Sequence, residues 1–271
     1  SSSSNRVTGS TPSTIAGQLN SNGKVLMINP NGVMITKEGV VKTGSFTAST
    51  LDIKNEDFLN NKFKFTGNGS SKSVNNKGKI IIGSGGSAAL LGGQISNSGV
   101  VSAKLGKIAL GAGEKITLDF VGDGLMSVTV PSNKLSVVKD INGKTLKSII
   151  SNSGKLEANG GIIKLSAATA KYLSRASVNI GSSGMIVARS VNEKSGKVVI
   201  GSPIEDNIKI AGKIDVSGHK SHSPSGTVTV RGRSVSHSGK IFAKGRSGGK
   251  VNIISKDSIK LNGSVLAQGS I

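Results

Sequence analysis

The chain has 271 residues with 38 Gly, 5 Pro and no Cys, and its 35 Lys and Arg residues against 14 Asp and Glu residues give a net charge of +21. The missing cysteines exclude disulfides, thiolate catalysis and cysteine-based metal sites. Aromatic residues make up only 3% of the chain, which is low for a globular core of this size, and no apolar run approaches the roughly 20 residues of a membrane-spanning helix.

A short unit recurs along the chain: a Gly-Lys pair, then a β-branched residue or Leu, then a brief alternating strand. Gly can form a tight corner because it has no Cβ, and β-branched residues favour half-buried strands. Many short strands, each after a corner signal, predict an all-β solenoid whose coils pack on their neighbours. Eight occurrences of this unit begin at Gly23, Gly78, Gly106, Gly154, Gly196, Gly212, Gly239 and Gly249.

The strongest turn signal lies early, in the dense block at residues 22–53. Asn29 and Pro30 are followed directly by Asn31 and Gly32. Pro30 has a fixed φ and biases Asn29 toward an extended conformation, while Asn31 and Gly32 tolerate positive φ. This segment therefore predicts a tight corner between two strands.

Two segments break the pattern and are expected to leave the coils as excursions on the outside of the rod. Residues 54–66 hold three of the six Phe residues, and we expect a helical turn plus a hairpin there. The second excursion is expected at residues 121–147, which contain Gly122-Asp123-Gly124, Pro131 and the hairpin-type turn Asn142-Gly143.

Toward the C-terminus the corners recur at irregular intervals, 27 residues from Gly212 to Gly239, 23 from Gly226 to Gly249 and 24 from Gly239 to Gly263. Such a period is typical of a parallel β-helix with loops of varying length. Since neighbouring strands lie about 4.8 Å apart, roughly ten coils would give a rod about 50 Å long.

The sequence offers little catalytic chemistry. His219 and His222 lie in a Ser/Gly/Pro loop and His237 follows further on; without neighbouring carboxylates we expect exposed loop histidines rather than metal ligands. A polysaccharide-cleaving β-helix would need acids on one face of consecutive coils, and nothing in the sequence places them so. We therefore expect no enzyme activity, no metal and no cofactor.

The net charge has two interpretations. It can be a solvated basic surface that keeps a long rod soluble, or a surface that attracts anionic glycans, lipids or nucleic acid. The Lys residues are scattered, and no stretch combines clustered Arg with aromatic stacking residues as single-strand binders do. Nucleic acid is therefore not an expected partner.

Four early segments carry a family resemblance: Arg6-Val7-Thr8-Gly9, Ser21-Asn22-Gly23-Lys24-Val25, Ile28-Asn29-Pro30-Asn31-Gly32-Val33 and Ala48-Ser49-Thr50. In these segments, and in matches over nearly the whole chain, the sequence resembles the filamentous haemagglutinin family, the exported partners of two-partner secretion systems. The Thr50-Leu51-Asp52-Ile53 ending and the Phe-containing segment after it look most like the high-molecular-weight adhesin branch.

The resemblance implies a right-handed parallel β-helix in which residues 1–190 form the secretion domain and residues 191–271 continue the coils as a shaft. It also implies export through an outer-membrane β-barrel transporter to the surface of a Gram-negative bacterium, without membrane insertion. Family members carry further strands before the Arg-Val-Thr-Gly signature, whereas only five residues precede Arg6 here. We therefore expect an N-terminally truncated secretion domain, and either this chain is a fragment or its cap comes from elsewhere.

The resemblance also assigns candidate site residues. Asn29, Pro30, Asn31 and Gly32 match the motif associated with secretion competence, with a role in turn geometry and early nucleation rather than chemistry. Asn20, Asn22 and Gly23 form a similar turn one strand earlier and are a possible secondary motif.

Three functions remain open at this point. The first is a secreted, non-enzymatic adhesin or haemagglutinin that recognises a host-cell receptor or anionic host glycans. The second is a β-helical enzyme acting on anionic polysaccharide, which two or three acids on adjacent coils in a groove would favour. The third is the N-terminal stalk of a contact-dependent toxin exoprotein, which only sequence beyond this chain can distinguish from an adhesin.

Overall fold

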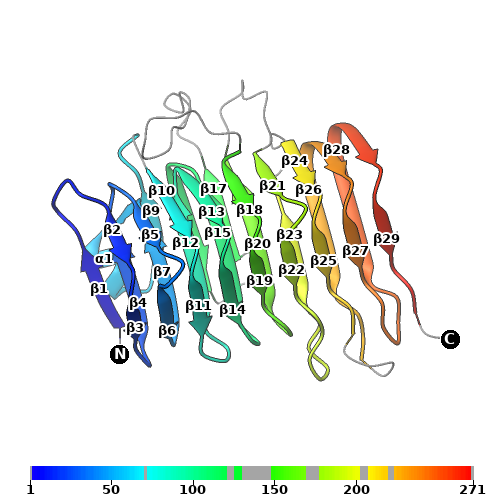
Figure 1. Cartoon of the computed structure of the whole chain (residues 1–271), viewed down its shortest axis with the longest axis horizontal. Helices are drawn as coiled ribbons and strands as arrows, with labels where there is room; N and C mark the ends of the chain where they lie inside the picture. Colours follow the sequence, from blue (N-terminus) through cyan, green and yellow to red (C-terminus); the bar gives the residue numbers. More distant parts are fainter. Residues whose placement is uncertain are drawn as a thin grey trace.

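The computed structural model describes residues 2–69, 72–120, 125–129, 148–168, 177–201, 207–218 and 223–269. In these residues the chain winds into a parallel β-helix with three faces, and successive coils stack along one axis (Figure 1). Each face holds nine strands within the described ranges, so the rod has nine coils there, close to the roughly ten expected. The predicted all-β parallel fold is confirmed.

The strands fall into three stacks, named here as faces 1 to 3. Face 1 contains β1 (Ser2–Arg6), β4 (Lys24–Ile28), β7 (Ser45–Ser49), β12 (Ser87–Gly92), β15 (Lys107–Ala112), β20 (Ile162–Ala167) and β23 (Lys197–Ile200). Face 2 contains β2 (Ser13–Ile15), β5 (Val33–Ile35), β10 (Ser73–Asn76), β13 (Gln94–Asn97), β18 (Ile150–Asn152), β21 (Val178–Ile180) and β24 (Asn207–Ile210). The long strands β26 (Thr227–His237) and β28 (Lys250–Leu261) run through both faces and join them. Face 3 contains β3 (Gln18–Asn20), β6 (Val40–Thr43), β11 (Lys79–Ile82), β14 (Val100–Ala103), β19 (Lys155–Glu157), β22 (Met185–Val187), β25 (Lys213–Asp215), β27 (Lys240–Phe242) and β29 (Ser264–Leu266).

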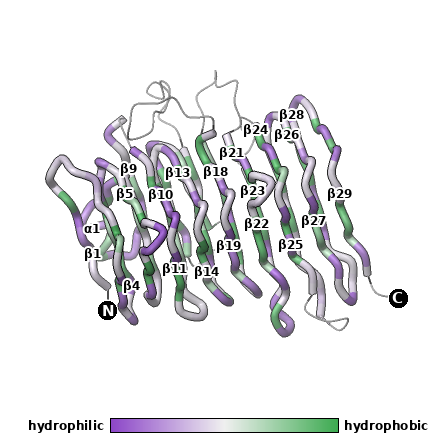
Figure 2. Tube along the Cα trace, in the orientation of Figure 1, coloured by the Kyte–Doolittle hydropathy of each residue, from purple (hydrophilic) through white to green (hydrophobic). Residues whose placement is uncertain are grey.

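The interior is built from columns of aliphatic side chains in register. In β11, Ile80 and Ile82 point inward while Lys79 and Ile81 point outward, as a period of two requires. Figure 2 shows hydrophobic residues recurring along the strands from coil to coil. One column on face 3 is fully buried and consists of Val41, Ile80, Val101, Leu156, Ile186, Ile214 and Ile241.

The Gly-Lys units mark two separate corners. Half of them precede face-1 strands and half precede face-3 strands, and at each corner the glycines of successive coils lie one above another. A Cβ on Gly78 would overlap the carbonyl oxygen of Gly39, and one on Gly99 would overlap that of Gly78. The repeat therefore reflects a close approach of the backbones of successive coils, which only glycine permits.

A second column, at the end of face 2, is polar in its middle. Asn76 donates to Asn97 over 2.8 Å and Asn97 donates to Asn152 over 2.7 Å, all three being buried. Higher in the same column lies His237, which is fully buried with Nε2 3.3 Å from the carbonyl oxygen of Ser264. The expectation of an exposed loop histidine is wrong for His237, because β26 continues through the corner and its alternation turns this side chain inward.

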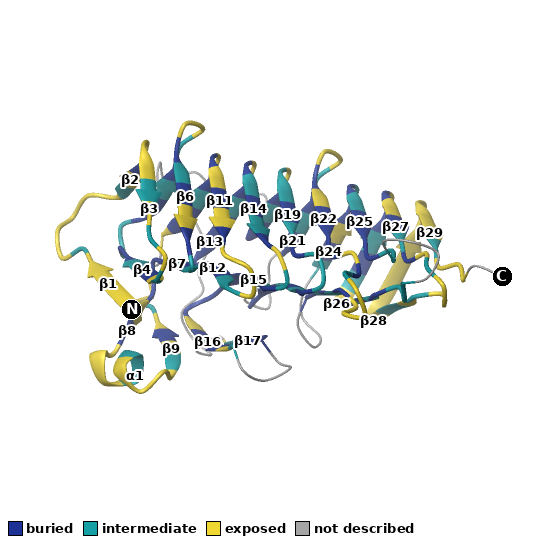
Figure 3. Cartoon of the chain, turned by 90° about the horizontal axis from the view of Figure 1, so that it is seen from below, coloured by how far each residue is buried: buried dark blue, intermediate teal, exposed yellow. Residues whose placement is uncertain are grey.

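Five elements lie outside the coils, on the outer side of face 1 (Figure 3). The strands form one antiparallel sheet in the order β17, β16, β9, β8, called here the extra-helical sheet. The expected helical turn is present as α1, and no helix in the described part of the chain is long and apolar enough to span a bilayer. The elements are β8 (Asp52–Ile53), α1 (Asn55–Leu59), β9 (Phe63–Thr66), β16 (Lys115–Asp119) and β17 (Leu125–Thr129).

The second excursion begins earlier than expected, because residues 115–119 already belong to this sheet. The two excursions, predicted as separate, therefore form one structure through β9 and β16. Asp123, Pro131, Asn142, His219 and His222 lie outside the described residues.

The extra-helical sheet buries a second apolar core against face 1. Leu51, Phe65 and Ile116 from outside the coils pack against Leu91 and Ala109 of the rod. As a result β12 is buried on both sides, with only its first residue partly exposed. This explains the continuous apolar run of this strand, which is otherwise typical of buried parallel strands.

Candidate functional site

The residues assigned to the secretion motif form the corner between β4 and β5, called here the 29–32 corner. It is a hydrogen-bonded turn in which the Gly32 N–H donates to the Asn29 carbonyl oxygen over 3.0 Å. Gly32 has a φ of 123°, whereas Asn31 keeps a negative φ. Asn at the first position, Pro at the second and Gly at the fourth are favoured in a β-turn, so the sequence folds this way for local reasons.

The side chain of Asn29 organises this corner. Asn29 is fully buried, and its amide nitrogen donates to the Thr11 carbonyl oxygen and the Ser13 hydroxyl, both over 2.9 Å. Its side-chain oxygen accepts from the Asn31 N–H over 2.9 Å. Both donors and the acceptor are therefore used, which is what a buried amide requires.

The corner connects three successive coils. Asn31 donates from its side chain to the Gly9 carbonyl oxygen over 2.7 Å, and Gly32 accepts at its carbonyl from the Ser13 N–H over 3.0 Å. In the other direction, the Asn29 N–H donates to the Ser49 carbonyl oxygen over 2.9 Å. The corner thus holds residues 9–13 of the first coil and is itself held by the third.

The secondary motif lies at the other end of β4. Asn20 and Asn22 are exposed, the Gly23 N–H donates to the Ser21 hydroxyl over 3.1 Å, and the Gly23 carbonyl oxygen accepts from the Ser45 N–H over 3.1 Å. Gly23 therefore begins the glycine column that leads into face 1. The structure does not bring the two motifs together, since the five residues of β4 separate them.

Arg6 has a role that sequence reasoning missed. Its guanidinium donates to the Asp52 carboxylate over 2.9 Å, to the Asn55 side-chain oxygen over 3.0 Å and to the Ile53 carbonyl oxygen over 2.7 Å. These contacts tie β1 to the start of residues 52–66, which contain β8, α1 and β9 and are called here the extra-helical segment. The partners lie more than 45 residues away, so no local signal points to them.

The acids of face 3 bear on the polysaccharide alternative. Glu157 and Asp215 share this face two coils apart, with Val187 between them in register. Each is bonded to a cation: Glu157 lies 2.7 Å from the Lys155 ammonium, and Asp215 lies 2.7 Å from the Arg189 guanidinium. This arrangement does not favour a pair of acids poised for glycoside cleavage, which needs two uncommitted carboxyl groups across one bond.

Asp215 is one of two buried acidic residues in the described part of the chain, the other being Glu114. The Asp215 side chain is only 4% exposed. Burial raises the pKa of Asp215, but hydrogen bonds from Arg189 and Ser217 outweigh burial and hold the pKa below its ordinary value. The same contact raises the pKa of Arg189. The pair is therefore charged on both sides and serves the structure of the rod.

Residues 4–199 match the family model described as the TPS secretion domain, which is well over half of the chain. The chain belongs to the TPS secretion domain family. The predicted family resemblance is thus confirmed.

Individual relatives of this TPS domain come from Haemophilus influenzae. Two proteins named heme/hemopexin-binding protein are 31% identical over 222 residues and 28% identical over 235 residues. Each match covers 79% of this chain and 22% or 23% of the relative, so the chain spans about a fifth of their length. The crystal structure of the HMW1 secretion domain is 29% identical with a TM-score of 0.76, and the match covers 98% of this chain and 69% of that one.

These similarities indicate the general function of the domain. TPS exoproteins are secreted, and a TPS domain implies a partner transporter in the outer membrane. The β-helix seen here matches the fold of a solved secretion domain along nearly its whole length.

Proposed function

We propose that this domain is the export and folding-nucleation end of a secreted surface adhesin or haemagglutinin, and that the 29–32 corner is its secretion motif. The observation that carries the motif assignment is the set of hydrogen bonds through which Asn29 and Asn31 hold residues 9–13. A corner that fixes one coil to the next is the smallest unit from which a solenoid can grow, because each coil packs only on its neighbours.

The proposed mechanism follows from this geometry. As the chain emerges from its transporter, the 29–32 corner closes the first two coils and leaves an open sheet edge on which the next coil pairs. Each added coil buries aliphatic side chains, which stabilises the exported state by roughly 25 cal/mol for every Å² of apolar surface removed from water. Folding outside the membrane thus opposes the return of the chain into the transporter.

We further propose that residues 1–190 form the secretion domain and residues 191–271 begin a shaft within one continuous solenoid. Two observations support this division. The family match ends at residue 199, while parallel coils continue without a change of fold to β29.

The end use of the exoprotein is proposed to be adhesion on a Gram-negative cell surface. The net charge of +21 supports attraction of anionic host glycans or an acidic host-cell receptor. The names of the two curated relatives support a second candidate, capture of heme or hemopexin by the whole exoprotein. A toxin carrier with the same N-terminal region is the third candidate, and the sequence that follows this chain decides it.

The test uses the full-length exoprotein in a Gram-negative host, with and without its transporter gene. We expect the protein in the medium or on the cell surface only when the transporter is present, and cells that display it should adhere to epithelial monolayers. A parallel assay with immobilised hemopexin distinguishes the second candidate. Equal release without the transporter would overturn the export proposal, and export without adhesion would overturn the adhesin proposal.

A further inference from the structure

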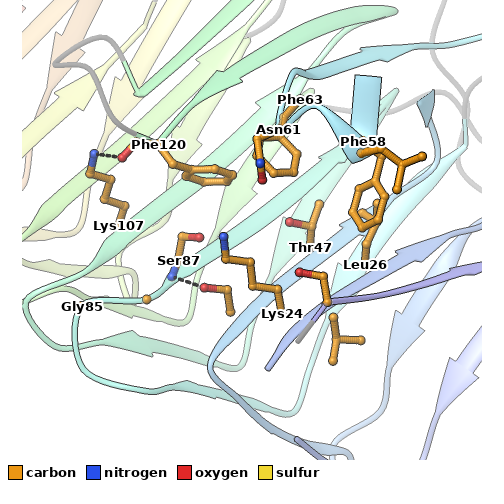
Figure 4. Close-up of a pocket in the computed structure, with 15 residues that line it drawn as sticks. Lys24, Leu26, Thr47, Phe58, Asn61, Phe63, Gly85, Ser87, Lys107 and Phe120 are labelled. Atoms are coloured by element: carbon orange, nitrogen blue, oxygen red, sulfur yellow. Dashed lines mark hydrogen bonds between the residues drawn. The ribbon is translucent and has the colours of Figure 1, made fainter. Parts of the chain in front are cut away.

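A cavity of about 460 Å³ lies between face 1 and the extra-helical segment (Figure 4). Its volume falls within the range of about 300–1,000 Å³ that is usual for sites of drug-sized ligands. The rod supplies one side of the cavity through β4, β7, β12 and β15, and α1, β9 and Phe120, the residue directly after β16, supply the other. It is separate from the 29–32 corner, and the proposed export role makes no use of it.

The rod side of the cavity is a polar row across four neighbouring strands. Lys24 pairs in register with Ser45, and Ser87 pairs with Lys107. The two inner residues are joined by a 3.0 Å hydrogen bond from the Ser87 N–H to the Ser45 hydroxyl. The row therefore has hydroxyl groups in the middle and an ammonium group at each end.

The opposite side is aromatic. The rings of Phe58 and Phe63 meet edge to face with centroids 6.5 Å apart, and those of Phe63 and Phe120 do so at 5.3 Å. All three rings are only half-buried and line the cavity. A ligand ring entering the cavity can extend this edge-to-face series, an arrangement worth about 0.5–1.5 kcal/mol per pair beyond the area buried.

The charged side chains that line the cavity, Lys24 and Lys107, are both cationic. The Lys107 ammonium already donates to the Phe120 carbonyl oxygen over 2.5 Å. The Lys24 ammonium has no partner among the described residues, and Figure 4 shows it reaching into the space beside Phe120 and Asn61. No carboxylate is among the residues that line the cavity. One uncompensated positive charge thus faces an aromatic wall.

We propose that this cavity binds an aromatic acid of two or three rings that carries a single carboxylate or sulfonate. The rings pack against Phe58, Phe63 and Phe120, and the anionic group bonds to the Lys24 ammonium, with the Ser87 and Ser45 side of the row facing the rim of the ring system. Charge-assisted hydrogen bonds of this kind are roughly twice as strong as neutral ones, so the anion gives the site its selectivity.

The test compares two fluorescent probes with the same three-ring skeleton, 8-anilino-1-naphthalenesulfonate and its uncharged analogue N-phenyl-1-naphthylamine. The chain suits this assay because it has no Trp and one Tyr. We expect saturable binding of one sulfonate probe per chain, and weaker binding of the uncharged probe by about tenfold, as expected for loss of one charged hydrogen bond.

Two variants and one control separate the contributions. Lys24→Gln should weaken the sulfonate probe about tenfold and leave the uncharged probe within twofold. Phe120→Leu should weaken both probes. Lys79→Gln removes an exposed Lys at the equivalent position after a corner glycine on face 3, and should change neither. Circular dichroism and thermal unfolding check that each variant folds.

Selective loss of the sulfonate probe in Lys24→Gln, together with loss of both probes in Phe120→Leu, supports the site. Equal loss of both probes in Lys24→Gln, equal effects of Lys24→Gln and Lys79→Gln, or full retention of binding in Phe120→Leu would overturn it.

Discussion

The side-chain amide of Asn29 donates a 2.9 Å hydrogen bond to the hydroxyl of Ser13, which lies sixteen residues earlier and one coil before it. Because Asn29 is fully buried, water cannot replace a hydrogen-bond partner that its side chain loses. The bond makes the position of β2 depend on the corner that follows β4. The first coil is therefore held in place by the second.

Replacing Asn29 with Ala should release the first coil. Loss of a buried hydrogen-bonded amide costs about 1–3 kcal/mol, and the effect should concentrate on residues 9–15. Hydrogen exchange followed by mass spectrometry should show faster exchange there and unchanged protection in coils four to eight. The control is Asn159→Ala, which removes a comparable corner bond to the Arg189 N–H far from the first coil. Unchanged exchange at residues 9–15 in Asn29→Ala would contradict the role given to the corner.

The glycine columns predict a sharp difference between two substitutions. Gly78→Ala places a Cβ against the carbonyl oxygens of Gly39 and Thr36, whereas Gly17→Ala at the first coil of the same column meets nothing within 4 Å. Overpacking against backbone costs about 1–3 kcal/mol or more, and an open surface change stays within about 0.5 kcal/mol. Denaturant unfolding measures both; equal stability of the two variants would count against the stacked corners.

Arg6 should hold the extra-helical segment to the first strand. Arg6→Met removes its three hydrogen bonds but keeps most of the aliphatic stem. We expect faster hydrogen exchange across residues 52–66 with little change in the coils. Arg233→Met is the matched control, because Arg233 bonds to Asp257 over 2.6 Å at an exposed site, and such pairs contribute about 0–1 kcal/mol. If residues 52–66 were equally protected from hydrogen exchange in both variants, Arg6 would not be what holds this segment to the first strand.

Asp215 gives the rod a defined acid sensitivity. Since its pKa is lower in the folded chain than in an unfolded one, Asp215 contributes stability that is complete above its unfolded value of about 3.9 and is lost as the pH falls through the lower folded value. Asp215→Asn should therefore reduce the thermal midpoint at pH 7 and lessen the loss of stability between pH 5 and pH 2. Asp257→Asn, at an exposed pair, should do neither. An identical pH profile for Asp215→Asn and the unmodified chain would refute this.

Much of the fold could be predicted from the sequence because short local patterns, the corner glycines and the strand alternation, specify a solenoid. The Gly-Lys pairs recur where two backbones approach closely, and the alternation in segments such as Lys79–Ile82 follows from one buried face. The turn at Asn29 and Pro30 is equally local, since its residue types favour it without help from the rest of the chain.

The extra-helical sheet could not be predicted in the same way. β9 and β16 pair although about 50 residues separate them, and antiparallel pairing between distant segments leaves no periodic signal in either. One local sign was present: in β12 the residues Ala88, Ala89, Leu90 and Leu91 break the alternation because the strand is buried on both sides. The burial of His237 has a related cause, since a long strand that bends through a corner keeps its alternation of inward and outward side chains.

The candidate site was predicted as a turn, but its partners were not. The hydrogen bonds from Asn31 to Gly9 and from Asn29 to Thr11 depend on how one coil stacks on another, which the sequence does not specify residue by residue. The location of Asn22 and Asn29 at opposite ends of one strand likewise emerges only from the structure.

The most direct test of the central claim is export of the full-length exoprotein with Asn31→Ala combined with Gly32→Ala, measured as the amount of protein in the medium beside an unchanged amount of transporter. Gly32 has a φ of 123°, which Ala adopts only with strain, and Asn31 loses its bond to Gly9. The control changes Asn68 and Gly69 to Ala, an Asn-Gly pair in an extra-helical loop where Gly69 also has a positive φ. We predict a marked loss of exported protein for the first variant and near-normal export of the second. Equal amounts of both variants and the unmodified protein in the medium would contradict the account.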